Sequence, residues 1–162
     1  MSLRTPIEPI ARGLLTAALV THLVPLLGTD GVLVGRSLAP PAGGWAGGQP
    51  GVGNFVGYTV VKTGKAVLLE SDPLGHNRMS WKCAYALTSS GGNESHCEDV
   101  ADRVRAAVVS LPENFTLRGV EWRLQKIDVP ELGAPTSSTA VDPPFWNVTD
   151  AVSLWLSRSR SA

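Results

Sequence analysis

The chain has 162 residues, enough for one domain with a normal hydrophobic core. Its 14 basic and 14 acidic residues cancel to a formal net charge of zero, which argues against a dedicated nucleic-acid-binding protein, because such proteins usually carry a concentrated basic face. Only 17% of the residues are charged, so repulsion between copies is weak, and the composition suits a chain that sits against partners as well as it suits a neutral monomer.

Neither secretion nor membrane insertion is indicated. The two cysteines, Cys83 and Cys97, are too few for a disulfide framework. The first apolar run, 13–27, is shorter than the roughly 20 residues that span a bilayer, and the N-terminus lacks the features of a signal peptide. We therefore expect a protein that is cytosolic at synthesis.

The first expected element is a helix at the N-terminus. The sequence Thr5-Pro6-Ile7-Glu8 forms a capping box with proline in the first helical position, and Pro25 should end the helix at about Val24. Its apolar positions define one stripe, which predicts an amphipathic helix packed on the core. The stripe comprises Ile7, Ile10, Leu14, Ala17, Ala18 and Leu23.

A loop rich in glycine and proline follows at 39–54. Loops of this length without structure are uncommon and often functional. Trp45 lies in its middle, so this side chain either anchors a partner protein or folds back on its own domain.

The next segments read as strands. Residues 56–62 and 66–70 predict a hairpin that turns at Thr63-Gly64. Residues 78–88 alternate clearly and predict a strand with one apolar face. That face comprises Met79, Trp81, Cys83, Tyr85 and Leu87.

The strongest helical signal lies at 95–111. Ser95-His96-Cys97-Glu98 is a second capping box, and the positions that follow keep a spacing of 3.6 residues until Pro112. The expected buried stripe comprises Cys97, Val100, Ala101, Val104, Ala107, Val108 and Leu111.

Two strands are expected to close the chain, at 117–129 and 145–157, on either side of a proline-rich loop at 130–144. Val120, Trp122 and Leu124 share one face of the first, and Asp150 interrupts the apolar face of the second, as at a bulge or an edge. Helices and strands do not alternate as in parallel folds. The order therefore predicts a single α+β domain over 1–162, an antiparallel sheet with a long hairpin and helices on one face.

Charge is unevenly distributed along the chain. Residues 91–113 are mainly acidic, whereas residues 54–90 carry more lysine and arginine than acid. Opposed patches of this kind suit head-to-tail contact between copies, although they also occur as solvated faces.

The sequence contains no motif that indicates catalysis, cofactor binding or metal binding. Gly51-x-Gly53 lacks the third glycine of a dinucleotide fingerprint, and a strand rather than a helix follows it. The three histidines, His22, His76 and His96, fall in separate elements, and the chain has no C-x-x-C motif. Ser95, His96 and Cys97 are adjacent on a helix and point in different directions. We therefore expect no catalytic residue, cofactor or metal site.

The element order and the ending resemble the tail terminator proteins of long-tailed (siphovirus-type) actinobacteriophages. The ending is the run 143–156, Pro-Pro-Phe-Trp-Asn-Val-Thr-Asp-Ala-Val-Ser-Leu-Trp-Leu, an aromatic-led strand after a proline-rich loop. The acid-rich helix at 95–111 and the strand that holds Glu121-Trp122-Arg123 also fit this family. The resemblance covers nearly the whole chain and contains no sharp motif.

The resemblance implies a structural virion protein without catalytic residues. Such a chain forms a homo-hexameric ring that caps the tail tube, stops polymerisation of the tube protein and offers a docking surface to the head-side connector or stopper. DNA passes through the lumen without sequence-specific recognition. Another neck protein is the nearest alternative, and a small bacterial enzyme or ligand-binding domain is a more distant one. For the interface we predict Trp45 as an anchor, with Lys62 and Lys65 near an acidic partner surface.

Overall fold

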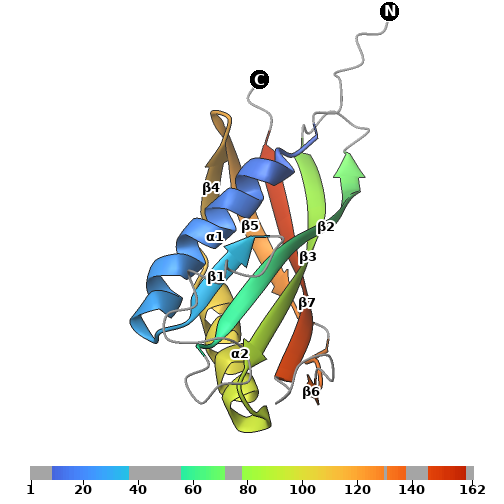
Figure 1. Ribbon diagram of the computed structural model, residues 1–162. Coiled ribbons are helices and arrows are strands. Elements are labelled where there is room, and N and C mark those ends of the chain that lie inside the picture. Colours follow the sequence, from blue (N-terminus) through green and yellow to red (C-terminus); the bar gives the residue numbers. More distant parts are fainter. Residues whose placement is uncertain (1–8, 37–55, 72–77, 130, 138–145, 160–162) are drawn as a thin grey trace, which may run out of the picture.

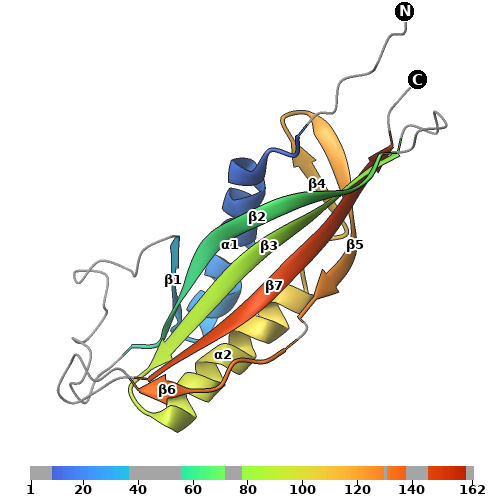
Figure 2. The same cartoon turned by 90° about the vertical axis from the view of Figure 1, so that its right-hand side faces the viewer.

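A computed structural model describes residues 9–36, 56–71, 78–129, 131–137 and 146–159, and over these ranges two helices pack on one face of a curled sheet (Figures 1 and 2). The α+β class and the placement of the helices are confirmed. The helices are α1 (Arg12–Thr29) and α2 (Glu94–Val109). The strands are β1 (Leu33–Arg36), β2 (Tyr58–Ser71), β3 (Arg78–Gly91), β4 (Asn114–Leu117), β5 (Val120–Asp128), β6 (Thr136–Ser137) and β7 (Trp146–Ser159).

The sheet is mixed, which corrects the prediction of a wholly antiparallel one. Its order is β1-β2-β3-β7-β5-β4, and the short β6 pairs with one end of β7. The exception is β1, which runs parallel to β2 in the register Leu33 to Tyr58 through Arg36 to Val61. The two strands are joined by the segment 37–57, which is long enough for the crossover that a parallel pair requires. β1 itself has no counterpart among the predicted elements.

The hairpin predicted between 56–62 and 66–70 is wrong, because these segments form one strand, β2, without a turn at Thr63-Gly64. Both residues lie inside β2, which pairs with β3 from Tyr58 to Ser71 and shifts register between Thr63 and Ala66. A β-bulge absorbs these two turn-like residues without ending the strand. Pairing with β3 on both sides of the bulge therefore outweighs the local turn preference, and the connection between the strands falls at 72–77, outside the described residues.

A second hairpin replaces the single strand predicted at 117–129. β4 and β5 are joined by Arg118-Gly119, whose φ angles of 52° and 73° are both left-handed. Two left-handed residues in a two-residue loop match the twist of the flanking strands, and glycine suits the second position. The expected apolar face of β5 is confirmed, because Trp122 is 2% exposed and both Val120 and Leu124 pack against the core.

The first helix differs from its prediction at both ends. The proposed capping box lies outside the described residues, α1 begins at Arg12, and Pro25 lies inside the helix. The helix continues past Pro25 because its buried stripe continues to Leu27, which is 1% exposed. Proline removes one hydrogen bond, and burial of a leucine side chain contributes a comparable free energy of about 2–3 kcal/mol.

The predicted stripe of α1 is also rotated from the observed one. Leu14 is exposed, whereas Thr16 is fully buried and its Oγ1 lies 3.2 Å from the Tyr85 hydroxyl. By length and composition α1 could cross a membrane, a test that core helices also pass. The buried stripe comprises Leu15, Thr16, Leu19, Leu23 and Leu27.

The second helix agrees with its prediction except at the cap. Asn93, rather than Ser95, is the N-cap, and its side-chain oxygen accepts a hydrogen bond from the backbone N–H of His96 at 2.8 Å. Every residue of the predicted stripe is buried, with exposures of 7% or less. This stripe packs on the same sheet face as α1, where the alternate residues of β3 and β7 complete the core.

Substitutions on two sides of α2 should therefore differ in their effect on stability. Val104 is 0% exposed, so Val104→Ala should lower the free energy of unfolding by about 1–3 kcal/mol through lost burial and a small cavity. Arg103 lies on the solvent side in exposed ion pairs, so Arg103→Ala should leave the free energy of unfolding close to that of the wild type. Urea denaturation of both variants tests this, and equal losses would contradict the assignment of the stripe.

Candidate functional site

The three residues predicted for the interface are not brought together by the described structure. Trp45 lies outside the described residues. Lys62 is exposed on β2 opposite Ala86, on the sheet face that the helices leave open. Lys65 lies in the bulge and lines a shallow cavity of about 370 Å³ together with Arg12 and Trp81. The two lysines therefore face different surroundings, and their role at an interface stays a prediction.

The helix start that carries Ser95, His96 and Cys97 has the geometry of a structural cap. The Cys97 thiol points into the core and donates to the Ser89 carbonyl oxygen at 3.5 Å, while His96 Nδ1 accepts from the Gly92 backbone N–H at 3.0 Å. Burial raises the pKa of Cys97 to about 11, so the thiolate needed for nucleophilic attack is disfavoured. Within the described ranges no three His, Cys, Asp or Glu side chains gather as metal ligands do.

Both cysteines are free and buried, as the sequence predicted. Burial raises the pKa of Cys83 to about 11 as well. We expect both thiols to react with a thiol reagent at pH 8 about a hundredfold more slowly in the native protein than in urea. The unfolded thiols ionise near pH 9, whereas the folded ones stay protonated, so this contribution to stability is present below pH 9 and is lost as the pH rises toward 11. Rapid labelling of either cysteine in the native protein would contradict this placement.

Much of the acidic patch predicted at 91–113 is neutralised within the chain. Arg103 contacts Asp30 at 2.8 Å and Asp99 at 2.9 Å, and these bonds raise its pKa. Arg105 contacts Asp102 at 2.9 Å and Asp150 at 2.8 Å. The opposition between acidic and basic segments is therefore weaker than the sequence suggested.

Arg105 and Asp150 form a partly buried ion pair at the edge of the described core. Asp150 is 2% exposed, and its carboxylate accepts two bonds from Arg105, Nε at 2.8 Å and Nη2 at 3.0 Å, and a third from the backbone N–H of Gly133 at 2.8 Å. This arrangement fixes α2 and the segment before β6 onto β7. A bulge or an edge was expected at Asp150. The bulge is wrong, because β7 keeps an unbroken register with β3 there, whereas an edge fits, because β5 and β6 pair with the other side of β7 only at 153–157 and 146–147.

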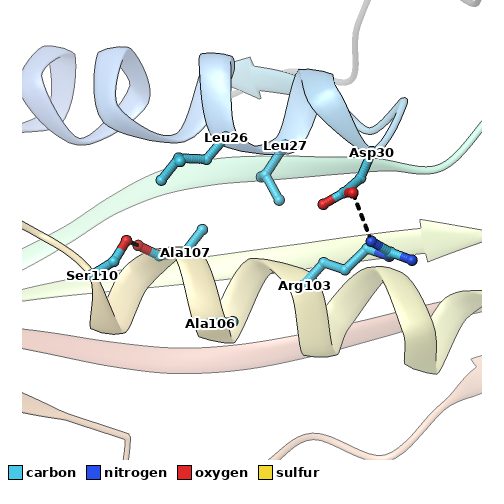
Figure 3. Close-up of a pocket in the computed structure, with 7 residues that line it drawn as sticks. All are labelled: Leu26, Leu27, Asp30, Arg103, Ala106, Ala107 and Ser110. Carbon is cyan, nitrogen blue, oxygen red and sulfur yellow. Dashed lines mark hydrogen bonds and ion pairs between the residues drawn. The ribbon is translucent and has the colours of Figure 1, made fainter.

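A groove separates α1 from α2 on the helical side of the molecule (Figure 3). Leu26, Leu27 and Asp30 line it from α1 and the residue that follows, and the ion pair to Arg103 closes one end. From α2, the small side chains of Ala106 and Ala107 leave this groove shallow.

The outer surface of α1 beside this groove carries no charge after Arg12. From Gly13 to Thr29 the helix has no Asp, Glu, Lys or Arg. Leu14, Val24 and Leu26 are 42%, 48% and 44% exposed, and Val109 on α2 is 69% exposed. Val24 and Leu26 are two residues apart and lie on different sides of the helix, so the exposed part of α1 is apolar on both sides and not along a single stripe.

The opposite side of the molecule is the open face of β2, β3 and β7, which no described helix covers (Figure 2). Small side chains occupy its centre, among them Ala84, Ala86 and Ser153, which are paired or neighbouring across β3 and β7. Toward one end the ring of Trp155 on β7 lies between Lys82 of β3 and Lys126 of β5, whose ammonium groups are 5.6 and 5.2 Å from its centroid.

Comparison with known proteins finds no family model that matches the chain and no curated protein similar to it.

Proposed function

We propose that the chain is a structural virion protein of the tail terminator kind, which assembles as a ring and caps a phage tail tube. The observation that carries this proposal is the presence of two unlike surfaces on opposite sides of a two-layer domain. The helical side is apolar and free of charge along α1, and the sheet side is basic around Trp155. A ring subunit that also caps a tube contacts partners of different kinds, and therefore needs unlike surfaces for them.

The character of the helical side suits a docked protein. Its exposed apolar side chains, Leu14, Val24 and Leu26, lie on a helix surface without the lysines and arginines that a membrane-surface helix carries along its polar face. We assign this surface to the tail tube protein or the head-side connector, the two partners that the resemblance implies for a ring subunit.

The loop 39–54, with Trp45, is the second contribution to docking under this proposal. We expect Trp45 to be its apolar anchor, because binding free energy at protein interfaces concentrates on aromatic side chains. The strand β2 follows this loop in sequence, and Lys62 on its open face then lies toward an acidic partner surface. Lys65, in the bulge of β2, provides a second positive charge.

A phage that carries this gene provides the test. Loss of the chain should give tubes of unregulated length and heads without tails, seen by electron microscopy. Complementation with Val24→Glu or with Trp45→Ala should fail or weaken, because each lost anchor costs about 2 kcal/mol of binding free energy. The purified variants should nevertheless melt near the wild-type temperature. Complementation with Glu121→Gln, an exposed change on β5, should be complete. Normal tails in the absence of the chain would rule the function out.

A further inference from the structure

We infer that the lysine–tryptophan row on the open sheet face of one subunit binds the acidic groove beside α2 of a second copy. The row consists of Lys82, Trp155 and Lys126, and the groove is lined by Glu98, Asp102 and Leu132. The inference rests on the proposed function, since it names the two surfaces through which the ring would close.

The row carries two positive charges that the described chain does not neutralise. Lys82 and Lys126 are cross-strand neighbours of Trp155 on either side of β7, and their ammonium groups lie over its ring. Neither forms an ion pair with a described carboxylate, in contrast to Arg103 and Arg105. The indole Nε1 of Trp155 likewise has no hydrogen-bond acceptor among the described residues.

The groove carries two matching negative charges. Arg105 contacts both Asp150 and Asp102, so three carboxylates, those of Glu98, Asp102 and Asp150, are balanced by one guanidinium, and the groove keeps a net charge of −2. Glu98 and Asp102 are one helical turn apart on the same side of α2. Leu132, which is 59% exposed, borders the groove across from them, and the cavity of about 320 Å³ has Val148 in its wall.

The two surfaces complement each other in charge, in apolar content and in position. Two ammonium groups face two carboxylates, and the tryptophan side chain meets an exposed leucine, the kind of aromatic anchor at which interface energy concentrates. Val148 of the groove and Trp155 of the row lie on the same strand, seven residues or about 23 Å apart. They cannot meet within one subunit, so each is free to bind a different neighbour, as a head-to-tail contact requires.

The charges therefore indicate that the partner bound at the row and at the groove is a second copy of this chain. The chain as a whole is neutral, and its uncompensated lysines and carboxylates are segregated onto different surfaces, so the complement of each surface is present in every other copy. Association through these charges should weaken as the salt concentration rises, because exposed charges are screened.

Two neutralising variants test the contact in the full chain. Lys82→Gln/Lys126→Gln disables the row and leaves the groove, and Glu98→Gln/Asp102→Asn disables the groove and leaves the row. Each variant alone should self-associate at least tenfold more weakly than wild type in analytical ultracentrifugation, with unchanged far-UV circular dichroism. Glu113→Gln/Glu121→Gln, which changes two exposed acids elsewhere, is the matched control and should assemble as wild type does.

The decisive sample is an equimolar mixture of the two variants. It should contain heterodimers and no larger species, because only one intact row and one intact groove remain for each pair. Variants that form the same ring as wild type would overturn the inference and leave the proposed ring in place. Weakened variants that do not combine in the mixture would show that row and groove do not bind each other. A wild-type chain that stays monomeric, alone and with tail tubes, would overturn both proposals.

Discussion

Arg105→Leu is expected to lower the free energy of unfolding by about 3 kcal/mol, one of the largest losses from a single change in this chain. The reason is that Asp150, 2% exposed on β7, would keep only the Gly133 N–H as a partner. A buried carboxylate without a counter-charge is costly, whereas the intact pair itself contributes little beyond what apolar side chains of the same volume would contribute.

The double variant Arg105→Leu/Asp150→Val separates these effects. Removing both charges leaves no buried charge unpaired, so we expect the double variant to recover most of the loss, and the coupling between the two changes should be about 2 kcal/mol. Urea denaturation of the wild type, both single variants and the double variant measures it. Additive losses would mean that Asp150 is compensated by something other than Arg105.

Gly91→Ala is expected to destabilise the fold by roughly 3 kcal/mol or more, through overpacking against backbone that cannot move aside. Gly91 ends β3, and a Cβ built on it would lie 2.7 Å from the Cα of Cys97, in the first turn of α2. The strand and the helix start approach so closely that only glycine fits between them.

Gly28→Ala provides the matched control with the opposite sign. Gly28 lies in the last turn of α1, and a Cβ there would meet nothing within 4 Å. Alanine has the higher helix propensity, so this variant should gain about 0.5 kcal/mol. Thermal melting of the two variants should thus shift in opposite directions. A small or favourable shift for Gly91→Ala would show that α2 does not pack against the end of β3 as described.

The elements that the sequence predicted well are those with a sustained period. The 3.6-residue stripe of α2 and the alternation of β3 and β7 extend over many residues, so burial of one face dominates every local preference. Trp122 and its neighbours on β5 were recognised for the same reason. Placement of both cysteines in the core followed directly from these stripes.

The errors arose where local signals competed with tertiary packing. Thr63-Gly64 has the composition of a turn, but pairing with β3 makes it a bulge. Pro25 usually ends a helix, but α1 continues past it because Leu27 is buried. β1 is too short to show a period, and its parallel pairing depends on a crossover that no local pattern encodes.

The candidate surfaces were less accessible from the sequence than the fold. Lys82, Lys126 and Trp155 come from three strands that are distant in the chain, and only the register of β3, β7 and β5 brings them together. Asp150 did carry a signal, as the one acid on an otherwise apolar strand face, but its partner Arg105 sits 45 residues away on a helix. A polar residue on a buried face predicts a partner without identifying it.

The mass of the assembled protein tests the central claim most directly. Native mass spectrometry or light scattering of the purified chain, alone and after addition of tail tubes, should reveal a species close to six times the subunit mass of 17.1 kDa. A hexamer, alone or at the end of the tubes, is the result that a ring-forming terminator predicts. A chain that remains at 17.1 kDa in both samples, and does not bind the tubes, would contradict it.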